Sequence, residues 1–266
     1  MFEQSFDRSD SGILDACFHE ATDIVNRVHS CPDPRKLPFP LLVYDDAIPI
    51  RTLIQLQSVR LHDSYRYVGG HYIRSDDPKI LDIGHNGGPS IVINTNRARS
   101  SWANSLLHEY WHFIEEHVRG AEGTTPKCKA ALRDLAEAIT GTNEYKRVLA
   151  DYDDLKEGAI VLGDALAYGA TGAKDAAEVT PQRVEDSKVY LKITAYHVQA
   201  DEWIARCYVQ WVATKSGLDC GASIIKKTVD EKTVTGLPIY LRDSLSIAKV
   251  SGRFEYLFKC LDCSWL

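Results

Sequence analysis

The sequence predicts an α+β fold in which a small, mainly antiparallel sheet comes first and helices follow. Short β-branched or aromatic runs, separated by Gly, Pro, Asn and Asp, occupy residues 41–95. Apolar residues at helical spacing dominate from residue 100 onward. The 266 residues are 44% hydrophobic and contain no visible repeat or long linker, so we expect one domain over 1–266.

The first two segments of this domain differ in their patterns. Residues 1–35 are expected to be helical, because apolar residues recur at helical spacing over 11–29 before the proline-rich stretch "CPDPRKLPFP". Residues 40–120 are expected to hold the sheet and one helix. The strand candidates are "LLVYDD" (41–46), "YRYVGGHYI" (65–73), "KILDIG" (79–84) and "SIVINT" (90–95).

The remaining sequence is predicted to be mostly helical. The helix that ends the second segment can be capped by Ser100 or Ser101 and can end at Gly120. In residues 121–266, the stretch "GATGAKDAAEVTP" (169–181) is the best candidate for a flexible loop. Helices are expected at 127–139, 143–157, 158–169, 181–195, 200–216 and near 243–262.

A possible metal site lies in the stretch "LLHEYWHFIEEHV" (106–118). A helix turns about 100° per residue, so His108 and His112 differ by about 40° and one turn, and both imidazoles can reach one ion. Glu109 lies beside them. Zinc binds imidazole nitrogen, and a neighbouring carboxylate can take the proton of an attacking water. His108, Glu109 and His112 therefore form the pattern His-Glu-x-x-His.

Chance does not easily produce this pattern. Nine histidines and 14 glutamates in 266 residues give roughly 0.016 accidental matches. The neighbouring residues Leu106, Leu107, Trp111, Phe113 and Ile114 are large and apolar, so the helix is expected to be buried. Two histidines and a carboxylate on a buried helix are costly without a partner, and a metal would supply one. Satisfied core histidines are the alternative.

The third metal ligand is expected from another helix, and Glu202 is the best candidate. It stands at the start of the apolar helix "ADEWIARCYVQWVA", where Arg206 is one turn away and could hold a carboxylate. A simpler explanation is that the helix dipole favours an acidic residue there. A metzincin would need a third histidine at position 118, which is Val. Weaker candidates for the third ligand are Asp134, Glu137 and Glu144.

These motifs resemble those of a known protein family. "HEYWH" followed by a separate helix beginning with Glu resembles the gluzincin branch of zinc metallopeptidases. "AYHVQADEWIARCYVQWVA", with upstream "GGHYI" and "SIVINT", is similar to the metallopeptidase domains of large polyvalent proteins of phages and mobile elements. The resemblance covers roughly residues 65–213 and implies a zincin-like fold, with Zn²⁺ bound by His108, His112 and Glu202 and with Glu109 as general base. The gap of ninety residues before Glu202 departs from the short gluzincins.

The expected activity is hydrolysis of a peptide bond in a specific protein or peptide substrate. Tyr196 is the catalytic candidate for oxyanion stabilisation, with His197 beside it as a second candidate; both could equally be packing residues. The strand "SIVINT" is the expected edge for pairing with an extended substrate. The alternative is a non-catalytic binding or structural protein with a structural metal, although a purely structural site does not need Glu109.

With a net charge of −6, the chain has no basic surplus that would argue for binding nucleic acid or anionic membranes, so neither is an expected partner. A nucleic-acid-binding regulator is thus the least favoured function. The seven cysteines are scattered, and Cys260-Leu-Asp-Cys263 lacks a second pair for a zinc site. With no signal-peptide pattern or apolar run of membrane-spanning length, we expect a cytoplasmic protein, or one delivered into another cell. The sequence does not indicate its oligomeric state.

Overall fold

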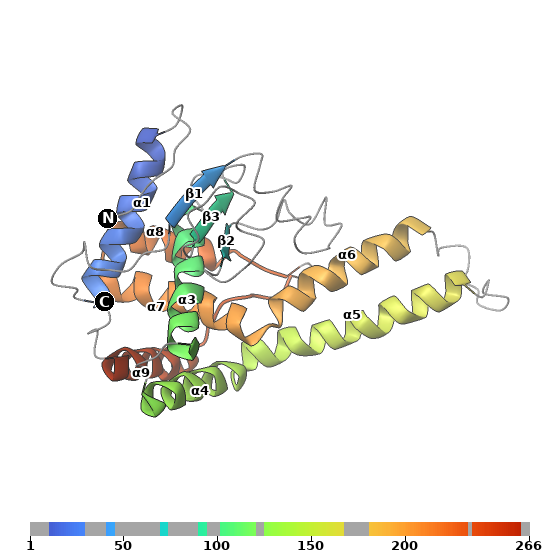
Figure 1. The fold of residues 1–266 in the computed structure, drawn as a ribbon. Helices are drawn as coiled ribbons and strands as arrows, with labels where there is room; N and C mark the ends of the chain where they lie inside the picture. Colours follow the sequence, from blue (N-terminus) through green and yellow to red (C-terminus); the bar gives the residue numbers. More distant parts are fainter. Residues whose placement is uncertain are drawn as a thin grey trace.

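The computed structural model describes residues 11–29, 41–45, 70–73, 90–94, 102–120, 125–167, 181–233 and 236–261. Helices dominate these ranges (Figure 1). The elements are α1 (Ser11–His29), β1 (Leu41–Asp45), β2 (Gly70–Ile73), β3 (Ser90–Asn94), α3 (Trp102–Gly120), α4 (Pro126–Thr140), α5 (Asn143–Ala167), α6 (Pro181–His197), α7 (Ala200–Ser216), α8 (Asp219–Thr228) and α9 (Ser244–Leu261). No helix in these ranges is long and apolar enough to cross a membrane.

The fold-class prediction, an α+β zincin-like fold with a mainly antiparallel sheet, is wrong. The described residues are overwhelmingly helical, and their strands are three short segments in the order β1-β3-β2. β2 pairs antiparallel with β3, but the longer pairing, β1 with β3, is parallel. Alternation of apolar and polar residues indicates strands without indicating which strands pair or in which direction, and this explains the error.

Most helix boundaries agree with the sequence patterns, but two expectations differ. The helices expected at 143–157 and 158–169 form the single helix α5, because Gly158 lies inside it without ending it. Helix α8 was not expected. The proposed caps Ser100 and Ser101, the strand candidate 79–84 and most of the expected loop at 169–181 lie outside the described residues.

Helix α7 lies at the centre of the described fold and contacts α1, α3, α4, α6, α8 and α9. Every residue from Glu202 to Ala213 is buried. Gly217 ends the helix in the left-handed conformation (φ 64°). Gly221 lets α8 approach the end of α7, because a Cβ at this position would lie 2.4 Å from the carbonyl oxygen of Ala213.

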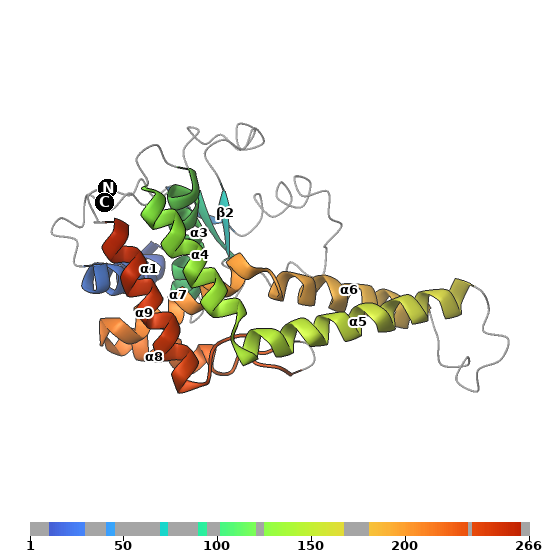
Figure 2. The ribbon, with the colours of Figure 1, turned by 90° about the horizontal axis from the view of Figure 1, so that it is seen from below.

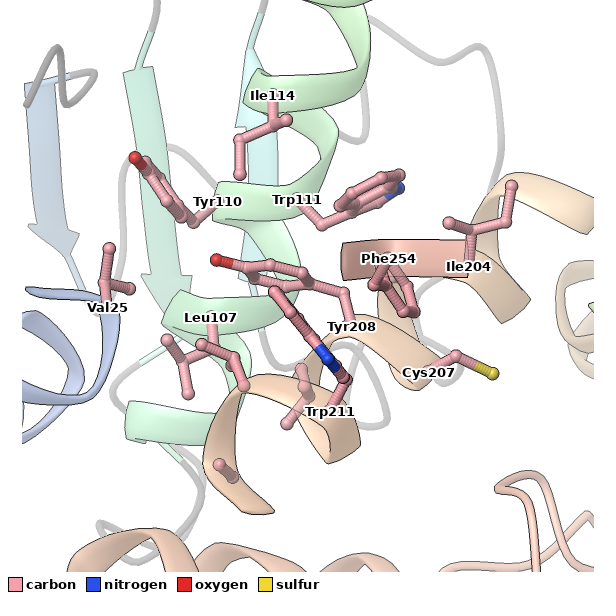
Figure 3. Close-up of a cluster of buried hydrophobic side chains, with 14 of the residues drawn as sticks. Val25, Leu107, Tyr110, Trp111, Ile114, Ile204, Cys207, Tyr208, Trp211 and Phe254 are labelled. Carbon is pink, nitrogen blue, oxygen red and sulfur yellow. The ribbon is translucent and has the colours of Figure 1, made fainter. Parts of the chain in front are cut away.

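The contact between α3 and α7 forms the main core (Figure 3). Leu107, Trp111, Ile114 and Val118 recur at intervals of three or four residues and are fully buried, so they form one apolar stripe along α3. Trp111 of this stripe lies against Tyr208 of α7, with ring centroids 5.3 Å apart. This packing fixes the rotation of α3 and therefore the direction of its neighbouring polar stripe.

Helices α5 and α6 form a hairpin that projects away from the other helices (Figures 1 and 2). The base of the hairpin is fixed to the start of α7. Tyr145 of α5 donates a hydrogen bond to the Val198 carbonyl (2.9 Å) and packs edge-on against Trp203, whose indole donates to the His197 carbonyl (2.5 Å). Helices α5 and α6 thus leave the core and return to it beside Glu202.

The last turn of α1 is held to α7 and α9 by His29. Its Nε2 lies 3.0 Å from the Tyr208 hydroxyl, and its ring centroid lies 4.2 Å from that of Phe258. Burial disfavours the imidazolium form, and together with the nearby Lys215 cation it lowers the pKa of His29 to about 3.

His29 should therefore make the stability of the fold sensitive to acid. Below pH 6.5 this histidine is protonated in the unfolded chain but stays neutral in the folded protein. The contribution of His29 to the free energy of unfolding is therefore complete above pH 6.5, and it falls by about 1.4 kcal/mol per pH unit as the pH drops toward 3. When the free energy of unfolding is measured with denaturant at pH 7.5 and 5.0, the loss between these two pH values should be about 2 kcal/mol smaller in His29→Gln than in the wild type. His19→Gln, at an exposed position of α1, is the control. An equal pH effect in His29→Gln and the wild type would contradict this role.

Candidate metal centre

A polar stripe runs along α3 beside the apolar one. It consists of His108, His112, Glu115 and Arg119, spaced by four, three and four residues. Because the apolar stripe packs against α7, the polar stripe lies along the margin of that interface. The two imidazole centroids are 5.1 Å apart, as expected for adjacent turns of one helix.

Helix α7 brings Glu202 to the two histidines. Nε2 of His108 lies 3.0 Å from Oε2 of Glu202, and Nε2 of His112 lies 3.4 Å from Oε1. One ligand atom from each of the three residues lies within 4.8 Å of the others. The structure therefore brings together His108, His112 and Glu202, although 94 positions separate the first from the last.

The electrostatics of this cluster favour a negative carboxylate beside one cationic imidazole. Burial alone would raise the pKa of Glu202, but hydrogen bonds from the two histidines hold it well below its usual value. Burial lowers the pKa of His108. For His112, hydrogen bonds to Glu115 and Glu202 outweigh burial and raise the pKa to about 10. Without a metal, His112 thus carries the positive charge that balances Glu202.

Glu109 is also buried, with 5% of its surface exposed. Burial and the negative charge of Glu202 raise its pKa to about 8, although the charge of His112 and a hydrogen bond from the backbone of Tyr72 oppose this. Tyr72 lies on β2, and its hydroxyl donates to Glu116. Strand β2 is therefore attached to the face of α3 that carries Glu109.

Glu115 supports the cluster from the next turn of α3. Its Oε2 lies 3.8 Å from Nδ1 of His112, the nitrogen that faces away from Glu202. Arg119 donates to Oε1 of Glu115 from Nε (3.0 Å) and from a terminal nitrogen (2.6 Å). A carboxylate beside the second imidazole nitrogen is the usual outer partner of a metal-binding histidine, because it fixes the ring orientation.

Tyr196 and His197 end α6 beside the cluster. The loss of solvation around the Tyr196 hydroxyl and the negative charge of Glu202 raise its pKa well above 10, so it remains a proton donor at neutral pH. Burial and the Arg206 cation lower the pKa of His197 to about 3, so its ring is neutral. The geometry brings Tyr196 to the same carboxylate as the two histidines of α3.

The weaker candidates for a third ligand lie elsewhere. Asp134 is 3.7 Å from Arg253 on α9, and Glu137 is exposed on α4. Glu144 accepts hydrogen bonds from the backbone N–H groups of Arg242 and Asp243. None of these three carboxylates joins the two histidines in the described part of the chain.

The strand expected to bind substrate is not at an edge. "SIVINT" contains β3, which pairs with β1 on one side and β2 on the other, so its backbone groups are already used. Strand β2 is at an edge of the described sheet. No sequence pattern indicates the role of Tyr72, because its contacts with Glu109 and Glu116 come from a strand that is distant from α3 in the chain.

The residue types in this cluster could hold a metal ion, and Zn²⁺ is one ion that binds such ligands. Two imidazole nitrogens from partly buried histidines and the buried carboxylate of Glu202 converge at short mutual distances, and this ligand set occurs in catalytic zinc sites that keep one position open. The two histidines compete for one carboxylate and share its oxygens, an arrangement that a divalent cation would satisfy better than a proton.

No protein-family model matches the chain, and no curated protein or solved structure is significantly similar to it. The resemblance to gluzincins therefore depends on the two motifs and on the geometry that α3 and α7 give them.

The metal prediction is tested by elemental mass spectrometry on protein purified without chelator and supplied with Zn²⁺. Wild type should hold one zinc per chain, and His112→Ala and Glu202→Ala should lose it, because each removes one of three protein ligands. Glu109→Ala is the matched control and should retain the metal. A wild-type protein without metal would disprove the site.

Proposed function

We propose that this protein is a zinc-dependent endopeptidase that hydrolyses a peptide bond in a specific protein substrate. The observation that carries the proposal is the convergence of His108, His112 and Glu202 next to a buried carboxylate, Glu109, on the same helix as the two histidines. A structural zinc site uses four protein ligands, whereas three ligands and an adjacent carboxylate are typical of a catalytic site.

In this proposal, zinc held by His108, His112 and Glu202 would supply Lewis acidity toward the scissile carbonyl and would make the attacking water more acidic. Glu109 accepts a proton from that water and delivers it to the leaving amine. Its burial and the hydrogen bond from the Tyr72 backbone hold the carboxylate in place. Burial raises the pKa of Glu109 and so makes its carboxylate a stronger base, while the positive charge of a bound metal ion would oppose this shift and favour the carboxylate form that accepts the proton.

Tyr196 is proposed to donate a hydrogen bond to the oxyanion that develops on the substrate carbonyl. Its hydroxyl stays protonated beside Glu202, and 36% of the surface of the residue is exposed. His197 is the weaker candidate for this role, because burial and the Arg206 cation lower its pKa to about 3 and keep the ring uncharged.

Strand β2 is the proposed site for an extended substrate. It lies at an edge of the described sheet, and Tyr72 connects it to Glu109 and Glu116 on α3. A substrate strand pairing with this edge would run past the general base, and main-chain hydrogen bonds would hold it in an extended conformation.

The proposed activity is tested by incubating the zinc-loaded protein with a proteome-derived peptide library and identifying new termini by mass spectrometry. Glu109→Gln should reduce cleavage by about 10²- to 10⁴-fold while retaining zinc, because the neutral amide cannot accept the proton. Zinc binding with no cleavage by the wild type, in this library and in intact protein extracts, would favour the alternative of a non-catalytic, metal-stabilised protein.

For Tyr196, the expected result is a fall in kcat of about 10²-fold in Tyr196→Phe, with zinc content and KM little changed. The Phe ring keeps the packing against Arg206 and removes the hydroxyl alone. Tyr190→Phe, at an exposed position of α6, is the matched control. Unchanged kcat in Tyr196→Phe would show that another group stabilises the oxyanion.

A further inference from the structure

Arg206 is buried beside the metal centre, with 3% of its surface exposed. It lies on α7 one turn after Glu202, and its guanidinium makes two contacts. A terminal nitrogen lies 3.8 Å from Oε2 of Glu202, and Cζ lies 5.4 Å from the centre of the Tyr196 ring. The other terminal nitrogen is buried without a hydrogen-bond partner among the described residues.

Burial of an arginine with incomplete pairing is costly, and an apolar residue of similar size would stabilise a core at least as well. Its charge does not favour metal binding either, because a cation at this position repels a metal ion. Neither core packing nor net charge accounts for an arginine here. Its two contacts, with Glu202 and with Tyr196, remain as the explanation.

We propose that Arg206 is a positioning residue of the metal centre, which holds the carboxylate of Glu202 toward the two histidines and the ring of Tyr196 beside that carboxylate. This inference rests on the metal site of the proposed function. Arg206 touches neither the metal position nor the substrate, and it acts through the two residues that do.

The planar guanidinium suits this role. It can place an N–H group on a carboxylate while its face lies against an aromatic ring, whereas a lysine ammonium cannot provide both contacts in a fixed geometry. Oε2 of Glu202 faces both His108 and Arg206, and Oε1 faces His112. At 3.8 Å the guanidinium is in ion-pair contact with Oε2, and its charge favours the orientation of the carboxylate that keeps this oxygen toward it.

The test compares Zn²⁺ affinity, by chelator competition, in the wild type, Arg206→Gln and Arg206→Lys. If positioning dominates, Arg206→Gln should bind Zn²⁺ at least tenfold more weakly, and Arg206→Lys should also bind more weakly because it keeps the charge but not the planar geometry. If charge repulsion dominates, Arg206→Gln should bind more tightly. Lys215→Gln removes a positive charge from an exposed position of α7 and is the matched control.

The visible spectrum of Co²⁺-substituted protein provides a second readout, because its bands report ligand geometry independently of activity. Both Arg206 variants should show altered bands, and Lys215→Gln should match the wild type. Near-UV circular dichroism of the metal-free proteins checks folding, and Arg206→Lys decides the question if Arg206→Gln does not fold. If both Arg206 variants bind Zn²⁺ within twofold of the wild-type affinity and show unchanged bands, the role of Arg206 is overturned and the proposed function is not. If the wild type binds no metal, the proposed function is overturned as well.

Discussion

Helix α7 is buried on every side over Glu202–Ala213, and it carries a carboxylate and a guanidinium into that interior. Ionised groups in such a place must find opposite charges nearby. For Glu202 the opposite charge is the imidazolium of His112, with His108 as a further hydrogen-bond partner, and for Arg206 it is Glu202 itself. The packing of α3 against α7 therefore satisfies the buried charges of α7 while it forms the core.

The aromatic packing between these helices gives the polar groups their geometry. Trp111 contacts both Tyr208 and Phe254, so α3, α7 and α9 share one cluster of rings. Since aromatic rings resist rearrangement in a close-packed core, α3 has little freedom to rotate or slide. The distances between the histidines and Glu202 are thus set by large apolar side chains that lie on the neighbouring stripe.

The sequence predicted local features better than the arrangement of elements. The spacing of His108 and His112 determines that their side chains share a face of one helix, and this needs no tertiary information. Helix α7 was expected at 200–216 because its composition is apolar, and the structure places it there. The direction of strand pairing, the joining of two expected helices into α5 and the position of Tyr72 depend on contacts between distant segments, which local patterns do not encode.

The α5–α6 hairpin separates the two histidines from Glu202 in the chain, and this has a consequence for biosynthesis. About ninety further residues must leave the ribosome after His112 before Glu202 emerges. At about 5–20 residues per second, this takes roughly 5–18 seconds. During that interval the nascent chain carries the histidine pair without its third partner, so the complete cluster forms only after Glu202 has emerged.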